Sequence, residues 1–339
     1  MGKNFPKITN LKDNPEFFEK TLKLIETSFK YQPPFSFKED FASLVESQNL
    51  QNCFILIDEA ESVLAHVGAK DRTVSVNGKS FTVTMLGGIS VEEKVRGAGH
   101  LQTLLQDVIA EKRDACAFFL LWSDLEKLYN KFGFYLCGNQ FEVDQSSEGK
   151  TDFFKTKFHL LTQQEQSSVA RLYETSFSKT YLTLNRSRSD WENVPPSADL
   201  YLRKATDGVT DYFFMNKGQD LPGVVYEYGG TGDVKQLIRD SSRTGKVWMG
   251  EELLATENSQ YQFFLSPGDL KLFTEFIREY SDSRISIRNI NSLKQEVFFD
   301  FSDELYSLEM EDFLRGMFGP GTFEELVTRP LFISGLDSI

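Results

Sequence analysis

The chain has 339 residues, of which 40% are hydrophobic and 26% are charged. This length favours two domains over one, and the composition is that of an ordinary globular protein. The formal net charge of -13 argues against general binding to nucleic acids or anionic membranes, because both require a basic surface. The charge is compatible with a cationic substrate.

Cysteine usage and the N-terminal sequence indicate a cytoplasmic protein. Cys53, Cys116 and Cys137 lie in apolar contexts without the spacing of metal ligands, so we predict buried free thiols and no metal site. The segment M-G-K-N-F-P-K-I-T-N lacks the apolar core of a signal peptide. No stretch of about 18 apolar residues is present, so we expect no membrane contact.

The first part of the chain is predicted to alternate between strands and helices. An edge strand is expected at Lys7–Thr9, followed by a helix over Asn14–Phe29 that Asn14 caps. A second helix is predicted to begin over Phe37–Val45, and Cys53–Ile57 has the continuous apolar pattern of a buried strand.

Two long strands come next. Ser62–Val76 and Phe81–Val91 form a predicted hairpin around Asn77-Gly78, a strong turn signal. Gly87-Gly88 indicates either a bulge or a close backbone approach in the second of these strands. His66, on the first of them, lacks an evident partner.

The region after the hairpin is predicted as helix, strand, short helix and strand. Ser123 and Glu126 have the spacing of a capping box, so a helix should start at Ser123, although Ser123 and Asp124 are alternatively substrate contacts. The predicted elements are Gly99–Lys112, Cys116–Leu121, the helix from Ser123, and Phe134–Val143.

The turn before the predicted helix Gly99–Lys112 has the features of an anion-binding site. Gly97 and Gly99 lie where a strand leads into a helix, whose first N–H groups and macrodipole favour an anion. Glycine lets the backbone approach a phosphate closely, and Arg96 adds a positive charge. Glycines at helix starts are common, so a purely structural role is the alternative.

The neighbouring sequence resembles that of the GCN5-related N-acetyltransferases (the GNAT superfamily). Motif A of that family reads Arg/Gln-x-x-Gly-x-Gly/Ala; Arg96 and Gly99 match its first and fourth positions, and Leu101 replaces the usual final Gly or Ala. Leu128–Phe134, L-Y-N-K-F-G-F, is similar to the later family signature L-Y-x-K-x-G-F, and Leu128 follows Arg96 by 32 residues.

This resemblance implies acetyl-coenzyme A (acetyl-CoA) as cofactor. Its diphosphate would bind the main-chain amides of Arg96, Gly97, Ala98, Gly99, His100 and Leu101. Its pantetheine arm would lie along Ile89, Ser90 and Val91, whose strand would also offer an amide to the developing oxyanion. Tyr129 matches the tyrosine that the family often uses as general acid, with a packed aromatic as the alternative.

The second half of the chain repeats features of the first. After a polar linker, Asp144–Lys150, the segment Leu172–Phe177 nearly repeats Leu24–Phe29 at an offset of 148 residues. Glu227–Ile238 has glycines but no matching arginine, so we expect a degenerate acetyltransferase-like domain without cofactor; an unrelated α+β domain is the alternative. The predicted elements there are Tyr212–Asn216, Gly223–Tyr228, Asp233–Ser242, Lys246–Met249, Tyr261–Leu265 and Pro267–Tyr280.

We therefore predict an α+β, layered fold with tandem acetyltransferase-like domains, whose mixed, mostly antiparallel sheets are flanked by helices. The expected parts are a cofactor-binding domain over 1–144, a degenerate domain over 151–290, and a C-terminal tail over 291–339 that packs on both. The tail is predicted to contain a strand at Glu296–Phe301, a helix at Leu305–Met317 and a further helical turn at Phe323–Val327.

A chain with two acetyltransferase-like domains, of which only the first keeps the family motif, resembles the enhanced intracellular survival family of aminoglycoside acetyltransferases. In that family the C-terminal carboxylate approaches the active site, which would bring Ile339 there. In the acetyltransferase fold the two first helices border the acceptor cleft, so the aromatic residues nearby either line it or simply pack: Tyr31, Phe35 and Phe37.

The predicted function is transfer of an acetyl group from acetyl-CoA to a primary amine of a small molecule or peptide. The base that deprotonates the amine is not identified by the sequence; Glu59, Glu61 and Asp124 are candidates. The alternatives are a non-catalytic acyl-CoA-binding or scaffolding protein, and a transferase for a longer acyl or an aminoacyl group. A homo-oligomer is compatible with the sequence.

Overall fold

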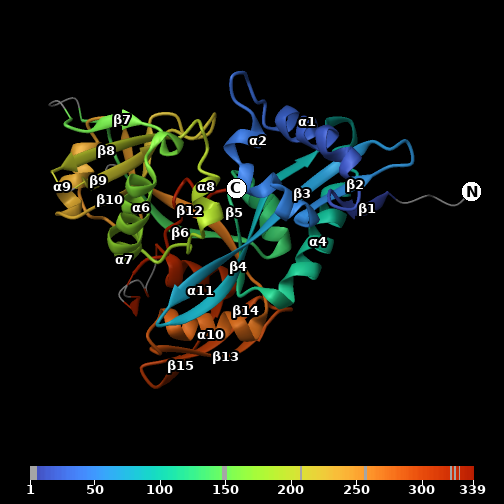
Figure 1. Ribbon diagram of the computed structural model, residues 1–339. Coiled ribbons are helices and arrows are strands. Elements are labelled where there is room, and N and C mark those ends of the chain that lie inside the picture. The colour runs from blue at the N-terminus through green and yellow to red at the C-terminus, as the bar shows by residue number, and fades with distance from the viewer. Residues whose placement is uncertain are drawn as a thin grey trace, which may run out of the picture.

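The computed structural model describes residues 6–146, 151–206, 208–255, 258–320, 323, 326–327 and 329–339. Within this part of the chain, twelve strands form one continuous sheet, in the order β1-β2-β3-β4-β5-β12-β6-β11-β10-β9-β8-β7. The strands are β1 (Lys7–Asn10), β2 (Cys53–Ile57), β3 (Val63–Val76), β4 (Lys79–Val91), β5 (Phe118–Leu121), β6 (Tyr135–Val143), β7 (Phe154–Thr156), β8 (Asp199–Ala205), β9 (Gly208–Met215), β10 (Val224–Gly230), β11 (Lys246–Met249) and β12 (Asn258–Pro267). Figure 1 shows the first strands and the later ones as two lobes with the C-terminus between them.

The helices connect and cover these strands. The α-helices are α1 (Phe18–Ser28), α2 (Phe37–Asp40), α3 (Ala42–Val45), α4 (His100–Lys112), α5 (Glu126–Tyr129), α6 (Gln163–Leu172), α7 (Ser178–Thr180), α8 (Arg188–Glu192), α9 (Val234–Ser241), α10 (Leu270–Tyr280) and α11 (Met310–Phe318). Shorter helical turns are η1 (Pro15–Phe17), η2 (Ser47–Asn52), η3 (Glu93–Val95), η4 (Arg113–Ala115), η5 (Asn130–Phe132), η6 (Phe158–Leu160) and the π-helical η7 (Tyr173–Phe177). No helix in the described ranges is long and apolar enough to cross a membrane.

The two halves of the sheet share one topology. Strands β1 to β4 pair antiparallel in sequence, α4 crosses over, and β5 pairs parallel with β4. Strands β7 to β10 repeat this meander, α9 crosses over, and β11 pairs parallel with β10. The tandem arrangement of the predicted fold class is therefore visible in the strand order.

The halves exchange their last strands. β6 follows β5 in the chain but pairs with β11, whereas β12 follows β11 and pairs with β5. The two exchanged strands pair antiparallel with each other at the centre of the sheet. The predicted boundaries at residues 144, 151 and 290 stay a prediction, and the sheet runs continuously across the first two of them.

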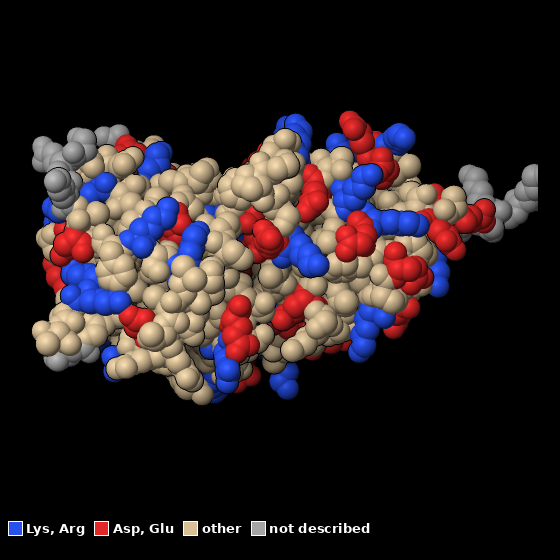
Figure 2. Space-filling model, turned by 45° about the horizontal axis from the view of Figure 1, so that its top comes forward, with Lys and Arg blue, Asp and Glu red and all other residues tan. Residues whose placement is uncertain are grey.

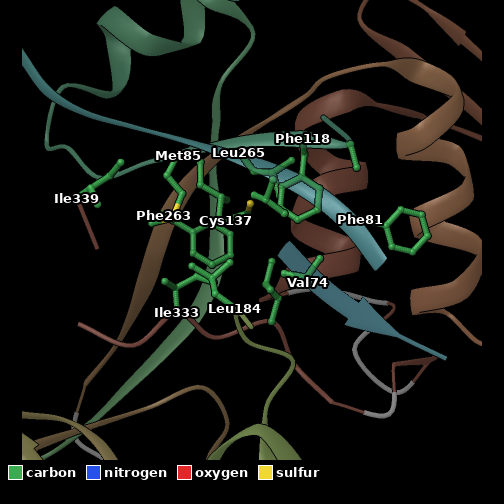
Figure 3. Close-up of a cluster of buried hydrophobic side chains, with 14 of the residues drawn as sticks. Val74, Phe81, Met85, Phe118, Cys137, Leu184, Phe263, Leu265, Ile333 and Ile339 are labelled. Atoms are coloured by element: carbon green, nitrogen blue, oxygen red, sulfur yellow. The ribbon is translucent and has the colours of Figure 1, made fainter. Parts of the chain in front are cut away.

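Alternate residues of the strands enter different cores. On β2, Ile55 belongs to a cluster that also contains residues of α1 and α10, while Phe54 and Leu56 join residues of α4. Helices α1 and α4 therefore cover opposite faces of the first half (Figure 1). Figure 3 shows that the first cluster also takes in Leu184 from the second half and Ile333 and Ile339 from the C-terminal tail.

A small separate sheet follows α10. It consists of β13 (Ile285–Asn291), β14 (Glu296–Phe301) and β15 (Glu304–Glu309), paired antiparallel in sequence. The prediction of helix from Leu305 is wrong for its first residues, because residues 304–309 pair with β14 and the helix begins at Met310. The predicted turn at Phe323–Val327 lies partly outside the described residues, as does the end of the predicted linker Asp144–Lys150.

The predicted start of the first helix is confirmed in position but not in its capping bond. Asn14 is the N-cap residue of η1, which begins at Pro15 and leads into α1 at Phe18, but the Asn14 side chain makes no capping hydrogen bond. Its Nδ2 group instead donates a hydrogen bond to Thr9 Oγ1 at 2.6 Å. By contrast, the Asn77-Gly78 turn is confirmed, since both residues have positive φ between β3 and β4.

Candidate active site

The turn between β4 and α4 presents main-chain N–H groups to solvent. Gly97 and Gly99 have φ angles of +80° and +85°, in the left-handed region that glycine tolerates. A Cβ on either residue would have no heavy atom within 4 Å, so the space beside them is open. Gly99 is the N-cap of α4, whose first turn has no capping side chain among the described residues. Its first N–H groups are therefore left for an anion.

Most of the predicted cofactor-binding residues line one cleft. They are Ile89, Ser90, Val91, Arg96, Gly97, Gly99, His100 and Leu101. Ala98 is not part of the lining, and its N–H donates to Val95 O at 3.3 Å instead. Arg96 stands at the rim, where its Nε donates to Val91 O at 3.4 Å. The binding roles of these residues stay predictions.

The cleft has a volume of about 1550 Å³ and extends far beyond the turn from Arg96 to Leu101, which we call the cradle. One wall comes from the region of α1 and α2, including Phe29, Tyr31 and Phe37. Another comes from the second half, including Asp220 and Trp248, and the floor includes residues of β6 and β12. Room for a large acceptor therefore exists beside the cradle.

The strands β4 and β5 separate beside the cleft. They pair only over Val83–Met85, although β4 continues to Val91. On its other edge β4 bulges: Gly88 has a φ of +59°, and the pairing with β3 shifts register between His66 and Gly68. The bulge predicted from Gly87-Gly88 is therefore present, and the alternative of a close backbone approach holds as well, because a Cβ on Gly87 would meet the main chain of Ile339 at 2.5 Å.

Tyr129 lies at the end of α5 and lines the cleft while being only 4% exposed. Its ring packs against Phe264 and Phe134, with centroid distances of 5.6 Å and 6.3 Å. Burial raises the pKa of Tyr129 to about 12, against the opposing effect of a hydrogen bond with Ser123. The phenol is therefore protonated at neutral pH and oriented by its surroundings.

The predicted capping box at Ser123 is wrong. α5 begins at Glu126 without a side-chain cap, and Ser123 Oγ accepts a hydrogen bond from Leu125 N at 3.1 Å. Ser123 instead neighbours the Tyr129 hydroxyl, and both Ser123 and Asp124 line the cleft. The tertiary contact with Tyr129 takes the place of the local cap.

Ile339, the last residue of the sequence, lies in the cleft beside β4. A Cβ on Gly87 would come within 2.5 Å of the Ile339 carbonyl carbon, so only glycine allows this approach. Figure 3 shows Ile339 beside Met85 of the same strand. The main-chain end of Ile339 is thereby brought to the place where β4 and β5 part.

A buried network that the sequence did not reveal holds the preceding tail residues. Arg186 donates to Glu227 Oε1 at 2.9 Å and to Asp337 Oδ2 at 2.8 Å, and Arg72 Nη2 donates to Asp337 Oδ1 at 3.1 Å. Lys217 Nζ donates to the Gly335 carbonyl at 2.8 Å and to the Ser338 carbonyl. These residues are far apart in sequence and form no motif, so no local signal could have indicated them.

The other candidate residues lie partly inside and partly outside the cleft. Asp124 lines the cleft, whereas Glu59 and Glu61 lie in the turn between β2 and β3 and are not part of the lining. Tyr31 and Phe37 line it, and Phe35 does not. Among the described residues, no group of three or more His, Cys, Asp and Glu side chains is arranged to hold a metal ion.

The corresponding turn of the second half differs from that of the first. Asp233 caps α9 by accepting a hydrogen bond from Lys235 N at 3.0 Å. Its carboxylate places negative charge at the start of this helix, whereas α4 has no capping side chain among the described residues. The absence of a cofactor from the second half stays a prediction.

Comparison with known proteins agrees with this geometry. The model of the acetyltransferase (GNAT) domain family matches residues 11–137, which include the cradle and Tyr129. These residues form a GNAT domain. No curated protein matches the sequence.

Solved structures share the GNAT fold over most of the chain. Eis1 from Mycobacterium abscessus has a TM-score of 0.58 at 12% identity and covers 89% of this chain and 85% of its own. A GCN5-related N-acetyltransferase from Anabaena variabilis has a TM-score of 0.56 at 12% identity and covers 89% and 85%. N-myristoyltransferase from Saccharomyces cerevisiae, with bound myristoyl-CoA, has a TM-score of 0.53 at 13% identity and covers 79% and 80%. At such identities the likeness concerns the fold.

Proposed function

We propose that the protein transfers an acetyl group from acetyl-CoA to a primary amine. The observation that carries this proposal is the shared cleft of three features: an uncapped α4 N-terminus, the parting of β4 and β5, and the buried Tyr129 phenol. The open space at Gly97 and Gly99 fits the diphosphate of a coenzyme A, which supplies the acyl thioester when bound.

Different residues of the cleft would bind the cofactor and transfer the proton. The amides of Gly97, Gly99, His100 and Leu101 hold the diphosphate, and the free edge of β4 at Ile89–Val91 pairs with the pantetheine arm. The N–H groups of Arg96 and Ala98 already donate to Glu93 O and Val95 O. The acceptor nitrogen forms a bond to the acyl carbon as the carbon–sulfur bond breaks. Tyr129, which its pKa of about 12 keeps protonated until then, donates its proton to the departing thiolate and afterwards regains one from solvent.

The amine must lose a proton before it attacks, because a free amine has a pKa of about 10 and is mostly charged at neutral pH. Asp124, one of the candidates for this base, lines the cleft, and its carboxylate is suited to accept the proton. Asp220 is the other acidic side chain of the lining, and it favours an acceptor with positive charge.

The test is release of coenzyme A thiol from acetyl-CoA against a panel of amines that includes aminoglycosides, polyamines, amino acids and peptides. The thiols of the protein do not interfere, because burial raises the pKa of Cys53 to about 12 and that of Cys116 to about 11, and raises that of Cys137 as well. Free thiols of this kind also suit a reducing, cytoplasmic environment.

Tyr129→Phe separates catalysis from binding. We expect kcat to fall by about 100-fold, within the range for loss of a general acid, while calorimetric affinity for acetyl-CoA is retained. Tyr135→Phe is the matched control, because that hydroxyl contacts Gln295 outside the cleft. Binding of acetyl-CoA without turnover of any amine by the unaltered protein would favour the non-catalytic acyl-CoA-binding alternative, and absence of binding would refute both.

A further inference from the structure

At the bulge in β4, the main-chain carbonyl of Gly88 accepts hydrogen bonds from side chains. Between the pairs His66–Ser90 and Gly68–Gly87, β3 contributes one residue and β4 contributes two. Gly88, the first of the two, has a φ of +59°. Its carbonyl oxygen is met by two side chains on one side of the sheet: His66 Nδ1 at 2.7 Å and Ser90 Oγ at 3.2 Å.

His66 is completely buried, and its hydrogen bond fixes its tautomer. A carbonyl oxygen only accepts, so Nδ1 carries the proton, and Nε2 is left without a hydrogen-bond partner in the described part of the chain. Burial lowers the pKa of His66 to about 4, against the effect of the Gly88 hydrogen bond, so the ring is neutral at neutral pH. A leucine here would pack without an unpaired polar atom. What histidine adds is therefore the Nδ1–H donor to Gly88.

The position of the Gly88 carbonyl determines the direction of the next N–H. The carbonyl of Gly88 and the N–H of Ile89 belong to one planar trans peptide, in which they point in opposite directions. Because His66 and Ser90 hold the carbonyl on their side, the Ile89 N–H faces away from them. Ile89 lines the cleft at a place where β4 no longer pairs with β5.

We infer that His66 is a positioning residue that acts through the Gly88 carbonyl, holding the Ile89 N–H toward the carbonyl oxygen of the acyl donor. Negative charge develops on that oxygen when the amine attacks, and a preorganised N–H stabilises it. This inference rests on the proposed acetyl transfer. The ring packs closely against Gly88, since a Cβ there would meet Phe37 at 3.0 Å and His66 at 3.2 Å.

Two substitutions of His66 distinguish positioning from packing. In His66→Asn, the side-chain amide nitrogen takes the position of Nδ1 and keeps a donor for Gly88, whereas His66→Gln moves the donor to the position of Nε2. We expect His66→Gln to lower kcat by about tenfold or more with little change in KM for acetyl-CoA, and His66→Asn to retain most of kcat. Thr21→Val is the control for loss of a buried polar contact, since Thr21 Oγ1 on α1 donates to Phe17 O of η1 at 2.8 Å and Thr21 does not line the cleft.

A second readout does not require turnover. The infrared stretch of acetyl-CoA labelled at its thioester carbonyl should shift to lower frequency on binding to the unaltered protein, because the Ile89 N–H polarises that bond. The shift should persist in His66→Asn and be lost in His66→Gln. If the unaltered protein binds acetyl-CoA without transferring it, the proposed function fails and the infrared shift still tests His66.

Equal kcat values and equal carbonyl frequencies in the two His66 variants would overturn the inference. A decrease of kcat in Thr21→Val as large as that in His66→Gln would also overturn it, because general loss of stability would then account for both. Thermal unfolding of all three variants shows whether each is folded at the assay temperature.

Discussion

At the start of α4 the site depends on main-chain conformation more than on side chains. Gly99 has a φ of +85° and has no neighbour that a Cβ would touch, so a substitution there acts through backbone strain alone. The left-handed conformation costs an L-residue about 1–2 kcal/mol. The same argument applies to Gly97, whereas Gly87 is required for space beside Ile339.

Gly99→Ala is expected to weaken binding of acetyl-CoA about tenfold. A strained turn relaxes in the free protein and must return to the binding conformation, and about 1.4 kcal/mol corresponds to a factor of ten in Kd. Isothermal titration calorimetry measures the effect. Gly232→Ala, in the corresponding turn of the second half, should leave Kd unchanged, because its φ is not left-handed and no atom lies within 4 Å of its Cβ position. Equal losses in both variants would contradict a single cradle in the first half.

At the scale of elements, the C-terminal tail is the part that links the two halves to the site. The segment contacts the second half through Leu331, which pairs with Leu182, and Ile333 exchanges two hydrogen bonds with Gln262 of β12. Arg186 lies between the rings of Tyr173 and Trp191, at 4.0 Å and 4.6 Å from their centroids. Burial raises the pKa of Asp337, but the charges of Arg186 and Arg72 outweigh this effect and hold it below its usual value.

Arg186→Met is expected to destabilise the protein by about 3–5 kcal/mol, because Glu227 and Asp337 would keep buried charges without this partner. Release of the tail should also lower kcat, since Ile339 follows Asp337 closely and lies beside Gly87. Urea unfolding and the thiol-release assay measure the two effects. Arg188→Met is the control: its partner Glu192 is on the same helix, and the arginine side chain is 88% exposed, so little change is expected. A variant at Arg186 as stable as this control would disprove the role of the network.

For the whole molecule, the exchange of β6 and β12 makes each half depend on the other. β12 pairs with β5 over residues 264–267 and with β6 over residues 258–265. The charges of the surface do not separate the halves: Figure 2 shows acidic and basic side chains interspersed across one face. A fragment of the first half would leave β5 paired with β4 only, without β12, and would leave β6 without both of its partners, β11 and β12.

Cleavage of the full chain between Ser146 and Thr151 is expected to leave the two pieces associated and able to bind acetyl-CoA, because the exchanged strands hold them. The separate fragment 1–146 should aggregate or remain unfolded, since its unpaired strand edges are exposed. Size-exclusion chromatography and circular dichroism distinguish these states. A soluble fragment 1–146 that unfolds cooperatively and binds acetyl-CoA would show that the first half is independent.

The sequence predicted those features that depend on local pattern. The bounds of β2, β11 and β14 agree with the predicted strands, and the β3–β4 hairpin turns at Asn77-Gly78. The GNAT motif around Arg96 was recognised because a phosphate-binding turn needs particular residues at adjacent positions. The helix predicted from Leu305 is wrong for its first residues, because pairing with β14 replaces the local preference. Asn14 occupies the N-cap position as predicted, but its side chain contacts Thr9 and makes no capping bond.

The sequence by itself determined a turn from Arg96 to Leu101 that resembles motif A of the GNAT family, repeated strand–helix units and a second turn without the arginine. Tertiary structure alone decided that β6 and β12 change places, that Arg186 and Asp337 meet, and that His66 contacts Gly88. The apolar pattern of a strand indicates which of its residues are buried, but it does not indicate which other strand pairs with it. Contacts between distant segments arise only when the sheet has assembled, and that assembly brings Ile339, Tyr129 and the cradle into one cleft.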